Sequence, residues 1–515
     1  MENKQKVLLR ISNLKQYFPT GKAGMYVKAN DGITLDIYEG ETFGLVGESG
    51  CGKSTLGRAI LQVYKQTDGR TMYYGRTRDE VAPKYVKDTI THLEHRIKKH
   101  KELEKSLFEL QAKYDKMSET EQYAAHESLR VAKKAANDAL LDVATIIGGF
   151  MASPDLGAVK AIYLEEYHIS SRLHKAQEQS KAIQLDYDDA AYADRVARER
   201  GKSPKDGPVK AAQAKLDACD RKIAGIEDEL KEVRKRMEDM RKPLRSDPEF
   251  QKYEAYCDDG IDLARLTYNE MRGLRNDLQL IFQDPYSSLN SRMTVGQIIG
   301  EGMLAHKYFK KNDDRMKEEV MHVMEECGLA SYFLHRYPHQ FSGGQRQRIG
   351  IARSLALRPK FVVCDEAVSA LDVSIQAQII NLLKDLKEQQ NLTYLFITHD
   401  LSVVKYISDR IGVMYLGSLV ELAQAQDIFD QPLHPYTEAL LDAIPTVEED
   451  ASKEPMVLEG DIPSPVNPPS GCKFHTRCKY CTEICTKVVP EMTEVKPGHF
   501  VACHHILSKG RTDAV

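Results

Sequence analysis

The sequence predicts an α/β fold that is interrupted by a long, all-α insertion and followed by a small cysteine-rich region. Short apolar runs that end in polar residues, a pattern typical of buried strands, alternate with helical segments on both sides of the insertion. Between them, residues 76–259 contain few glycines and prolines and are rich in Lys, Glu, Ala, Gln and Leu. Half of the 10 cysteines crowd between Cys472 and Cys503. We therefore divide the chain into residues 1–75, 76–259, 260–430 and 431–515.

The bulk properties exclude several classes of protein. The 515 residues are enough for roughly three domains. A formal net charge of −4 argues against a protein that holds nucleic acid by electrostatic attraction. No apolar run approaches the roughly 18–20 residues that cross a bilayer, and the longest, 143–152, contains two glycines. The N-terminus lacks the apolar segment of a secretory signal, so we expect a cytoplasmic protein.

Residues 7–11 and 33–37 have the β-branched and apolar composition of strands and are bounded by turn residues. Tyr17, Phe18 and Tyr26 lie between them. An aromatic side chain here is equally compatible with stacking on an adenine ring and with ordinary core packing.

A phosphate-binding motif follows the apolar run 42–46 and precedes a helical pattern at 56–64. The pattern G-x-x-x-x-G-K-[ST] is met by Gly47, Glu48, Ser49, Gly50, Cys51, Gly52, Lys53, Ser54 and Thr55. The glycines let backbone N–H groups close around phosphate oxygens at a helix N-terminus. Lys53 would reach the β- and γ-phosphates and the Ser54 hydroxyl would bind Mg²⁺.

The insertion carries apolar side chains at helical spacing. The first seam comprises Leu103, Leu107, Leu110, Tyr114 and Met117, and the second comprises Leu216, Cys219, Ile223, Ile226, Leu230, Val233, Met237 and Met240. Such seams, with charges between them, predict coiled-coil packing of four or five helical segments. Residues 118–121 have the pattern of a capping box that restarts a helix. The insertion is either a solvated helical hairpin or a docking arm for a partner.

Three predicted strands of the second half end in polar residues. They are 277–283, which ends in Gln283, 361–364, which is followed by Asp365 and Glu366, and 394–397, which precedes His399. The carboxyl ends of parallel strands meet at one edge of a sheet, where ligands collect. Asp365 is expected to hold Mg²⁺, and Glu366 to orient or polarise the attacking water.

These residues together resemble an ATP-binding cassette (ABC) ATPase. Besides the phosphate loop, the family motifs are the Q-loop Gln283, the signature Phe341-Ser342-Gly343-Gly344-Gln345 (usually Leu-Ser-Gly-Gly-Gln), the pair Asp365-Glu366, the D-loop Ser369-Ala370-Leu371-Asp372 and the switch His399. The resemblance implies that Glu366, His399 and Gln283 act in ATP hydrolysis. It implies Mg²⁺ at Ser54, Gln283 and Asp365, and an adenine-stacking aromatic at Phe18, with Tyr17 second. It also implies two cassettes paired head to tail, so that the signature of one covers the ATP of the other.

Five further segments narrow the resemblance to the F-type ATP-binding subunits of oligopeptide and dipeptide importers. They are residues 283–290, 368–376, 434–437, 463–472 and 498–503. The implied partners are a second ABC ATPase, two membrane permeases and, indirectly, an extracytoplasmic solute-binding protein, with this chain at the cytoplasmic face of the membrane. A permease helix would dock near Gln283 and residues 284–290. The helical insertion departs from the family pattern.

In a reducing compartment the cysteine cluster suggests a metal site before it suggests disulfides. The resemblance implies an iron–sulfur cluster at Cys472, Cys478, Cys485 and Cys503, and four thiolates suit either a 4Fe–4S cluster or Zn²⁺. Cys481 forms a Cys-x-x-Cys pair with Cys478, which keeps zinc as an alternative. We favour the 4Fe–4S cluster over zinc and over a group of free cysteines.

Two other protein classes share some of these features. A soluble ABC ATPase of the chromosome-maintenance type also carries a coiled-coil arm. Those arms are longer and follow the Q-loop glutamine, and the importer-type tail also argues against that class. A cassette protein that regulates translation normally has two cassettes, whereas one phosphate loop is visible here. Within the importers, peptides are the family default, and nickel or another small solute is the alternative.

Overall fold

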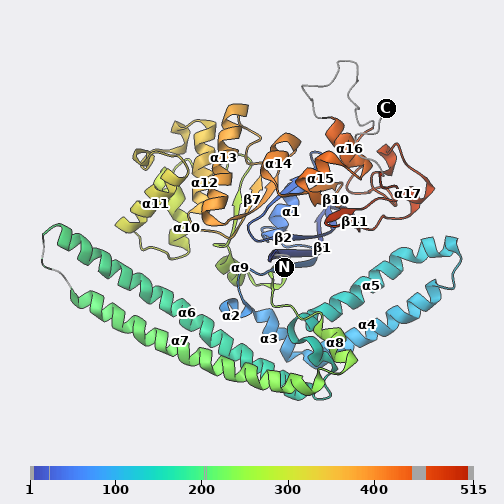
Figure 1. Cartoon of the computed structure of the whole chain (residues 1–515), viewed down its shortest axis with the longest axis horizontal. Coiled ribbons are helices and arrows are strands. Elements are labelled where there is room, and N and C mark those ends of the chain that lie inside the picture. Colours follow the sequence, from blue (N-terminus) through green and yellow to red (C-terminus); the bar gives the residue numbers. More distant parts are fainter. Residues whose placement is uncertain are drawn as a thin grey trace. The chain divides into compact units, whose positions relative to one another are not determined.

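The structure is a computed structural model that describes residues 5–507 except 23, 202, 204, 205, 312 and 444–459, without the side chains of 119, 120, 123, 124, 126 and 127. Its contacts divide the chain into two compact units (Figure 1). The first unit comprises the described parts of 1–75, 262–264 and 271–515, and the second comprises those of 76–261 and 265–270.

The first unit is built on two sheets. A four-stranded sheet has the order β2-β1-β4-β5, and an eight-stranded sheet has the order β11-β12-β10-β9-β3-β8-β7-β6. The strands are β1 Val7–Pro19, β2 Tyr26–Tyr38, β3 Thr42–Val46, β4 Asp68–Tyr73, β5 Ile261–Asp262, β6 Leu278–Ile281, β7 Phe361–Asp365, β8 Thr393–Ile397, β9 Arg410–Tyr415, β10 Ser418–Gln424, β11 Thr493–Lys496 and β12 His499–Val501. The five strands from β9 to β6 pair in parallel, and every residue of β3, β7, β8 and β9 is buried. These four strands are therefore covered on both faces, as the predicted α/β class requires.

Helices of the first unit follow the parallel strands and gather beside them (Figure 1). They are α1 Lys53–Ile60, α10 Val295–Ala305, α11 Asp314–Glu326, α12 Gly343–Leu355, α13 Val373–Gln390, α14 Leu401–Ile407, α15 Ala425–Asp430, α16 Pro435–Asp442 and α17 Glu483–Lys487, with 3₁₀ turns η3 Leu263–Arg265, η4 Ser331–Phe333, η5 Pro338–Gln340 and η6 His475–Arg477. One hydrophobic cluster joins α10–α13 to β6–β8. The C-terminal strand β12 pairs antiparallel with β10, so the cysteine-rich region continues the main sheet.

The first two strands are longer than predicted. The antiparallel pairing of β1 with β2 runs from Val7↔Tyr38 to Pro19↔Tyr26. Tyr17, Phe18 and Tyr26 are therefore strand residues, whereas the sequence pattern placed them between strands. Helix α1 ends at Ile60, earlier than the predicted 64.

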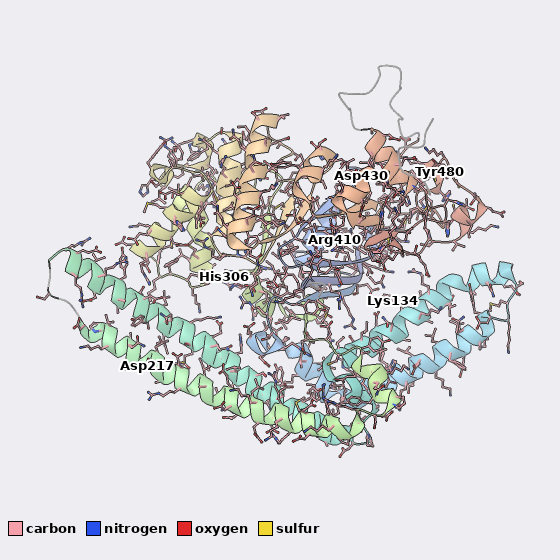
Figure 2. The ribbon with its side chains drawn as sticks, in the orientation of Figure 1. Lys134, Asp217, His306, Arg410, Asp430 and Tyr480 are labelled. Carbon is pink, nitrogen blue, oxygen red and sulfur yellow. The ribbon has the colours of Figure 1, made fainter. Side chains whose placement is uncertain are left out.

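Arg410 at the start of β9 lies inside the first unit (Figure 2). Its guanidinium is 3.4 Å from both carboxylate oxygens of Glu41 and faces the rings of Tyr38 and Phe43. Glu41 is 4% exposed. Burial raises the pKa of Glu41 to about 7, against the lowering effect of Arg410.

The second unit consists of helices, two pairs of which form hairpins that leave a common base in different directions (Figure 1). The helices are α2 Arg78–Val81, α3 Lys84–Thr91, α4 Leu93–Tyr114, α5 Glu119–Ile147, α6 Leu156–Glu199, α7 Asp206–Arg241 and α8 Pro248–Glu254, with η1 Gly148–Ala152 and η2 Lys242–Leu244, while α9 Tyr268–Leu274 crosses the boundary between the units. Between α4 and α5, the Ser118 N–H donates to Glu121 at 2.9 Å, as the predicted capping box requires.

Five of the eight predicted seam residues of α7 are buried, and Leu216, Ile223 and Met240 are partly buried. Cys219, Ile226, Leu230, Val233 and Met237 are each less than 9% exposed. The ion pairs Arg172–Glu229 and Arg236–Glu165 cross between α6 and α7 and fix an antiparallel register. The predicted seam of α4 is only half-buried, and the fully buried residues of α4 are Leu93, Ile97 and His100.

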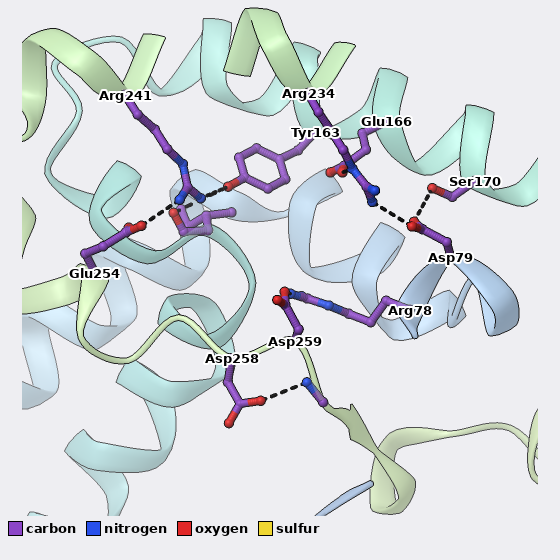
Figure 3. A network of polar contacts seen from close by, with 12 residues as sticks. Arg78, Asp79, Tyr163, Glu166, Ser170, Arg234, Arg241, Glu254, Asp258 and Asp259 are labelled. Atoms are coloured by element: carbon purple, nitrogen blue, oxygen red, sulfur yellow. Dashed lines mark hydrogen bonds and ion pairs between the residues drawn. The ribbon is translucent and has the colours of Figure 1, made fainter. Parts of the chain in front are cut away.

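A polar network ties the helices of this unit together at their base (Figure 3). Arg241 of α7 lies 2.6 Å from Glu254 of α8 and donates to the Tyr163 hydroxyl of α6 at 3.2 Å. Arg234 contacts Asp79 at 2.7 Å, and Ser170 donates to the same carboxylate at 2.8 Å. Because the residues that form this network come from α2, α6, α7 and α8, the base of the insertion is a small core of its own.

One expectation about the membrane needs correction. The sequence suggested no apolar stretch long enough to span a bilayer, but within the described residues Ser128–Ala152 passes by length and composition, with a mean hydropathy of 1.2. Over half of its most apolar 18-residue window, 56%, is buried inside the protein, and Val143, Ile147 and Phe150 of the segment belong to the core of the second unit. A buried core helix passes the same test, so this is weak support for a membrane span.

Candidate nucleotide-binding site

The phosphate loop connects β3 to α1 and is closely packed on its neighbours. Gly47, Gly50 and Gly52 have φ of 149°, 79° and 102°. A Cβ atom on Gly47 would lie 2.2 Å from the Met414 carbonyl oxygen, and one on Gly52 would lie 2.1 Å from the Ala29 carbonyl oxygen. Glycine is therefore required at both positions by space as well as by backbone conformation.

Lys53, the first residue of α1, bends back over the loop. Its Nζ donates to the carbonyl oxygens of Gly47 at 2.7 Å and Glu48 at 3.0 Å, and the residue is 4% exposed. The loop thus holds a buried ammonium group next to the N-terminus of a helix, an arrangement suited to binding an anion.

A cavity of about 410 Å³ opens beside the loop. It is lined by Phe18, Val27, Lys28, Ala29, Ser49, Gly50, Gly52, Lys53, Ser54, Thr55, Gln283, Glu366, Leu416, Gly417 and Pro465. Phe18 stands edge-on to the Tyr64 ring at 5.4 Å, whereas the Tyr17 hydroxyl donates to Asp31 at 2.6 Å. Of the two aromatic candidates, the structure places Phe18 at the cavity and Tyr17 outside its lining.

The carboxylate pair lies at the end of β7. Asp365 is fully buried, and Arg58 of α1 donates to its Oδ2 at 3.0 Å. The Oδ1 atom of Asp365 is buried and has no hydrogen-bond partner among the described residues. A buried carboxylate oxygen without a donor is costly, and the water shell of a Mg²⁺ ion would supply one.

Glu366 brings three of the predicted catalytic residues together. Its backbone φ is 48°, in the left-handed region that favours glycine, so Glu366 has a strained backbone conformation. Gln283 Nε2 donates to Glu366 Oε2 at 2.6 Å, and His399 Nδ1 lies 3.6 Å from Glu366 Oε1. The Glu366 carboxylate is thereby held between the ends of β6 and β8.

The signature residues lie outside the cavity lining. Ser342 caps α12 reciprocally with Gln345, whose N–H donates to the serine hydroxyl at 3.4 Å. Phe341, in place of the usual leucine, is 5% exposed and packs edge-on against Phe333 at 5.1 Å. Two D-loop residues, Ala370 and Asp372, are exposed, while Ser369 and Leu371 are partly buried.

No group of three or more His, Cys, Asp and Glu in the described part of the chain is placed to hold one metal ion. A Mg²⁺ ion that is bound through nucleotide phosphates, water, one carboxylate and a hydroxyl does not need such a group. For Mg²⁺, the Ser54 hydroxyl lines the cavity, and the orphaned oxygen of Asp365, which is buried beside the cavity-lining Glu366, is an acceptor suited to the water shell of the ion.

Four cysteines line a second, smaller cavity in the C-terminal region. They are Cys472, Cys478, Cys485 and Cys503, which have His434, His475, His504 and His505 around them. All are free thiols, and burial raises the pKa of Cys472 to about 11 and that of Cys503 to about 12. Cys481 is exposed and is absent from this lining. A single Zn²⁺ needs four ligand atoms at about 2.3 Å from one point, whereas a four-iron cluster keeps its thiolates further apart. Four thiols around one cavity are a donor set of the kind that holds an iron–sulfur cluster, while no three or more of these described side chains are placed to hold one metal ion.

The structure also shows contacts to the phosphate loop that sequence patterns missed. Arg477 is paired with Glu48, and the Glu48 N–H donates to the Tyr436 hydroxyl at 2.9 Å. Pro465 lines the nucleotide cavity and accepts a hydrogen bond from the Lys28 N–H at 3.1 Å. No local pattern could predict these contacts, because Glu48 and Arg477 are 429 positions apart.

The phosphate loop, the buried Asp365 and the Gln283–Glu366–His399 arrangement at one edge of a parallel sheet define a nucleotide-hydrolysing domain of the ABC class. Comparison with known proteins agrees. The sequence matches the family described as ABC transporter over residues 30–152 and 251–369. It matches the family described as oligopeptide/dipeptide transporter, C-terminal region, over residues 420–485.

Curated relatives narrow the assignment. The chain is 52% identical over 248 residues to the oligopeptide transport ATP-binding protein AppF of Bacillus subtilis, covering 48% of this chain and 75% of that protein. It is 53% identical over 245 residues to a putative peptide import ATP-binding protein of Brucella ovis, covering 48% of this chain and 77% of that protein. A solved dimeric bacterial ABC transporter cassette aligns with a TM-score of 0.42 at 15% identity, over 81% of this chain and 99% of that one. The chain belongs to the oligopeptide/dipeptide family of ABC transporter ATP-binding proteins, and it is an ABC-type ATPase subunit.

Proposed function

We propose that the protein binds and hydrolyses ATP as a subunit of an importer that takes up oligopeptides or dipeptides through membrane permeases. The observation that carries this proposal is the contact of Gln283 and His399 with Glu366, which lines the phosphate-loop cavity together with Gln283, in a chain with an oligopeptide/dipeptide-type C-terminal region. The substrate class rests on the names of the relatives, and nickel or another small solute is the alternative.

The residues in and beside the cavity would have different roles in ATP hydrolysis. The loop N–H groups and Lys53 would bind the phosphates, and Phe18 would stack on the adenine ring. Ser54, Gln283 and Asp365 would serve Mg²⁺, which stabilises charge developing on the phosphates. Glu366 would orient the attacking water, with Gln283 and His399 positioning its carboxylate.

We propose that a second ABC ATPase subunit completes the site. The signature residues Ser342, Gly343, Gly344 and Gln345 do not line this chain's own cavity. Ser342 is exposed at the N-terminus of α12, where free N–H groups suit the γ-phosphate of another cassette. The D-loop, residues 369–372, would lie beside that contact. ATP binding would then close the pair and hydrolysis would reopen it.

The loop after β6 is the proposed docking site for a permease at the cytoplasmic face of the membrane. Phe282 and Tyr286 are 41% and 63% exposed, and Arg346 covers the Tyr286 ring at 3.9 Å. Exposed aromatic side chains next to Gln283 would transmit movement of the permease to the catalytic site.

The paired helices α6 and α7 are proposed to be a coiled coil. The second unit is proposed to be a docking arm for a further partner.

Cys472, Cys478, Cys485 and Cys503 are proposed to hold a 4Fe–4S cluster, with zinc as the alternative. Such a cluster would bind the thiolates and cross-link four points of the C-terminal region. Protein purified without oxygen should be brown and contain iron and sulfide. A colourless protein with one zinc per chain would reverse the preference.

The test of the main proposal is co-purification from solubilised membranes. Tagged Glu366→Gln protein is prepared with ATP, since this variant should bind ATP without hydrolysing it and hold the closed state. The matched control carries Lys53→Ala in addition and should not close. Recovery of a second ABC subunit and two multi-span permeases with the first variant only is expected. Recovery of soluble proteins alone, with nothing from the membrane, would refute the importer assignment.

A further inference from the structure

Every polar group of Glu48, the second residue of the phosphate loop, is held by a specific partner. Its carboxylate is paired with Arg477 through two bonds of 2.8 and 3.0 Å. Its N–H donates to the Tyr436 hydroxyl at 2.9 Å, and its carbonyl oxygen accepts from Lys53 Nζ at 3.0 Å. Two of these three partners, Arg477 and Tyr436, come from the C-terminal region rather than from the parallel sheet.

The Arg477–Glu48 pair is shielded from water. The Arg477 side chain is 5% exposed and that of Glu48 is 21% exposed. A forked, charge-assisted pair in such surroundings fixes direction as well as distance, because the guanidinium plane must match both carboxylate oxygens. Removal of Arg477 would leave the partly buried Glu48 carboxylate without its guanidinium partner.

The same turn carries the thiol cavity. Arg477 directly precedes Cys478, and Phe474 lies two residues after Cys472. The Phe474 ring packs against Tyr436 at 5.3 Å and Tyr415 at 5.2 Å. The Cys472 N–H donates to the Cys485 carbonyl at 2.8 Å, which links the turn to a third cysteine. Both contacts that reach Glu48 therefore depend on how the turn 472–478 is held.

We propose that Arg477 is a positioning residue that couples the four-cysteine centre to ATP binding. With the thiolates held together, the turn presents Arg477 to Glu48 and keeps the phosphate loop in its binding shape. With the thiolates released, Arg477 loses its fixed direction, the loop relaxes and the affinity for ATP falls. This inference rests on the proposed ATP site and the proposed cluster, and it goes beyond both by giving the cysteine region a role in ATP binding.

The test measures the Kd of Mg²⁺ and a non-hydrolysable ATP analogue by calorimetry on full-length protein. Arg477→Ala should raise this Kd about tenfold, a loss of about 1.4 kcal/mol. Arg477→Lys keeps the positive charge but loses the two-bonded guanidinium geometry, so its Kd should lie between those of the wild type and Arg477→Ala. The control is Arg10→Ala, which removes another forked arginine–carboxylate pair, with Asp36, at the four-stranded sheet and should leave the Kd unchanged. Lys53→Ala tests the ATP site itself, so loss of binding there and an unchanged Kd for Arg477→Ala would refute only the coupling.

The second arm removes the metal. Protein is purified without oxygen, or reconstituted with ferrous iron and sulfide, and compared with the same protein after chelation under reducing conditions. Chelation should raise the Kd of wild type by the factor seen for Arg477→Ala and leave the Kd of Arg477→Ala unchanged. Equal weakening of both proteins, or a protein that retains no metal after reconstitution, would overturn the coupling. If Arg477→Ala does not fold, Glu48→Ala removes the same pair, and an unchanged Kd in that variant would also overturn the coupling.

Discussion

Two glycines of the phosphate loop should differ sharply in their tolerance of a methyl group. Gly50 and Gly52 both have positive φ, so alanine at either position carries a backbone strain of about 1–2 kcal/mol, partly offset by a stiffer unfolded chain. A Cβ on Gly50 meets nothing within 4 Å, whereas one on Gly52 lies 2.1 Å from the Ala29 carbonyl oxygen. Forcing β2 away adds about 1–3 kcal/mol of overpacking, and weakening the Asn30–Gly52 hydrogen bond of 3.0 Å adds about 1 kcal/mol. Gly50→Ala should thus cost about 1 kcal/mol and Gly52→Ala about 3–5 kcal/mol.

The suitable assay is native-state hydrogen exchange of the β3 amides in nucleotide-free protein. It reports the opening free energy of the first unit without requiring both units to unfold together. A difference of about 2–4 kcal/mol between the variants corresponds to roughly 30- to 900-fold faster exchange in Gly52→Ala. Equal exchange rates in the two variants would refute the conclusion that packing against Ala29, rather than backbone conformation alone, requires glycine.

Three further perturbations test other parts of the structure. Burial raises the pKa of Glu41 to about 7 from 4.5, so the folded protein keeps a proton that the unfolded chain releases, and stability should fall by up to about 3 kcal/mol as the pH rises from about 4 to 8. Glu41→Gln should remove most of that fall in a series of melting curves, and an identical fall in the variant would exclude Glu41 as its source. Leu230→Ala, in the buried seam of α7, should destabilise the second unit by about 2–5 kcal/mol in urea unfolding, while Asp228→Ala on the exposed face should change it by less than about 0.5 kcal/mol. Lys53→Ala should abolish ATP binding in equilibrium dialysis without loss of folding, and wild-type affinity would contradict the phosphate-loop assignment.

Local patterns could identify candidate residues for the nucleotide site because its parts are continuous in sequence. A strand, a glycine-rich loop and a helix start form one unit, and each proposed catalytic side chain lies within two residues of the end of a strand. The parallel pairing of β6, β7 and β8 then brings Gln283, Glu366 and His399 together without any further signal. The burial of the α7 seam follows from its apolar period in the same way.

The features that escaped prediction depend on distant pairings. β1 extends to Pro19 because it pairs with β2, which begins at Tyr26. The strand propensity of β1 alone does not contain the information about that pairing. The choice of Phe18 over Tyr17 depends on which face of β1 meets the cavity and on the hydrogen bond of Tyr17 to Asp31. The Arg477–Glu48 pair joins opposite ends of the chain. The helix Ser128–Ala152 was missed as an apolar segment because its charges are few rather than absent.

The place where the second unit is attached has a consequence for how the chain folds. The chain passes from the first unit into the second after β4 and returns to the first unit at β5. These two strands are neighbours in the four-stranded sheet, where Arg70 is paired with Asp262 at 3.5 Å. Before residues 76–261 fold, joining these two strands means closing a very long loop. Once they have folded with their own core, the same join resembles a short turn, and the entropy cost of closure falls by about 3–4 kcal/mol. Folding of the second unit should therefore make it easier for β4 and β5 of the first unit to pair. We expect the second unit, in the middle of the chain, to fold before the first.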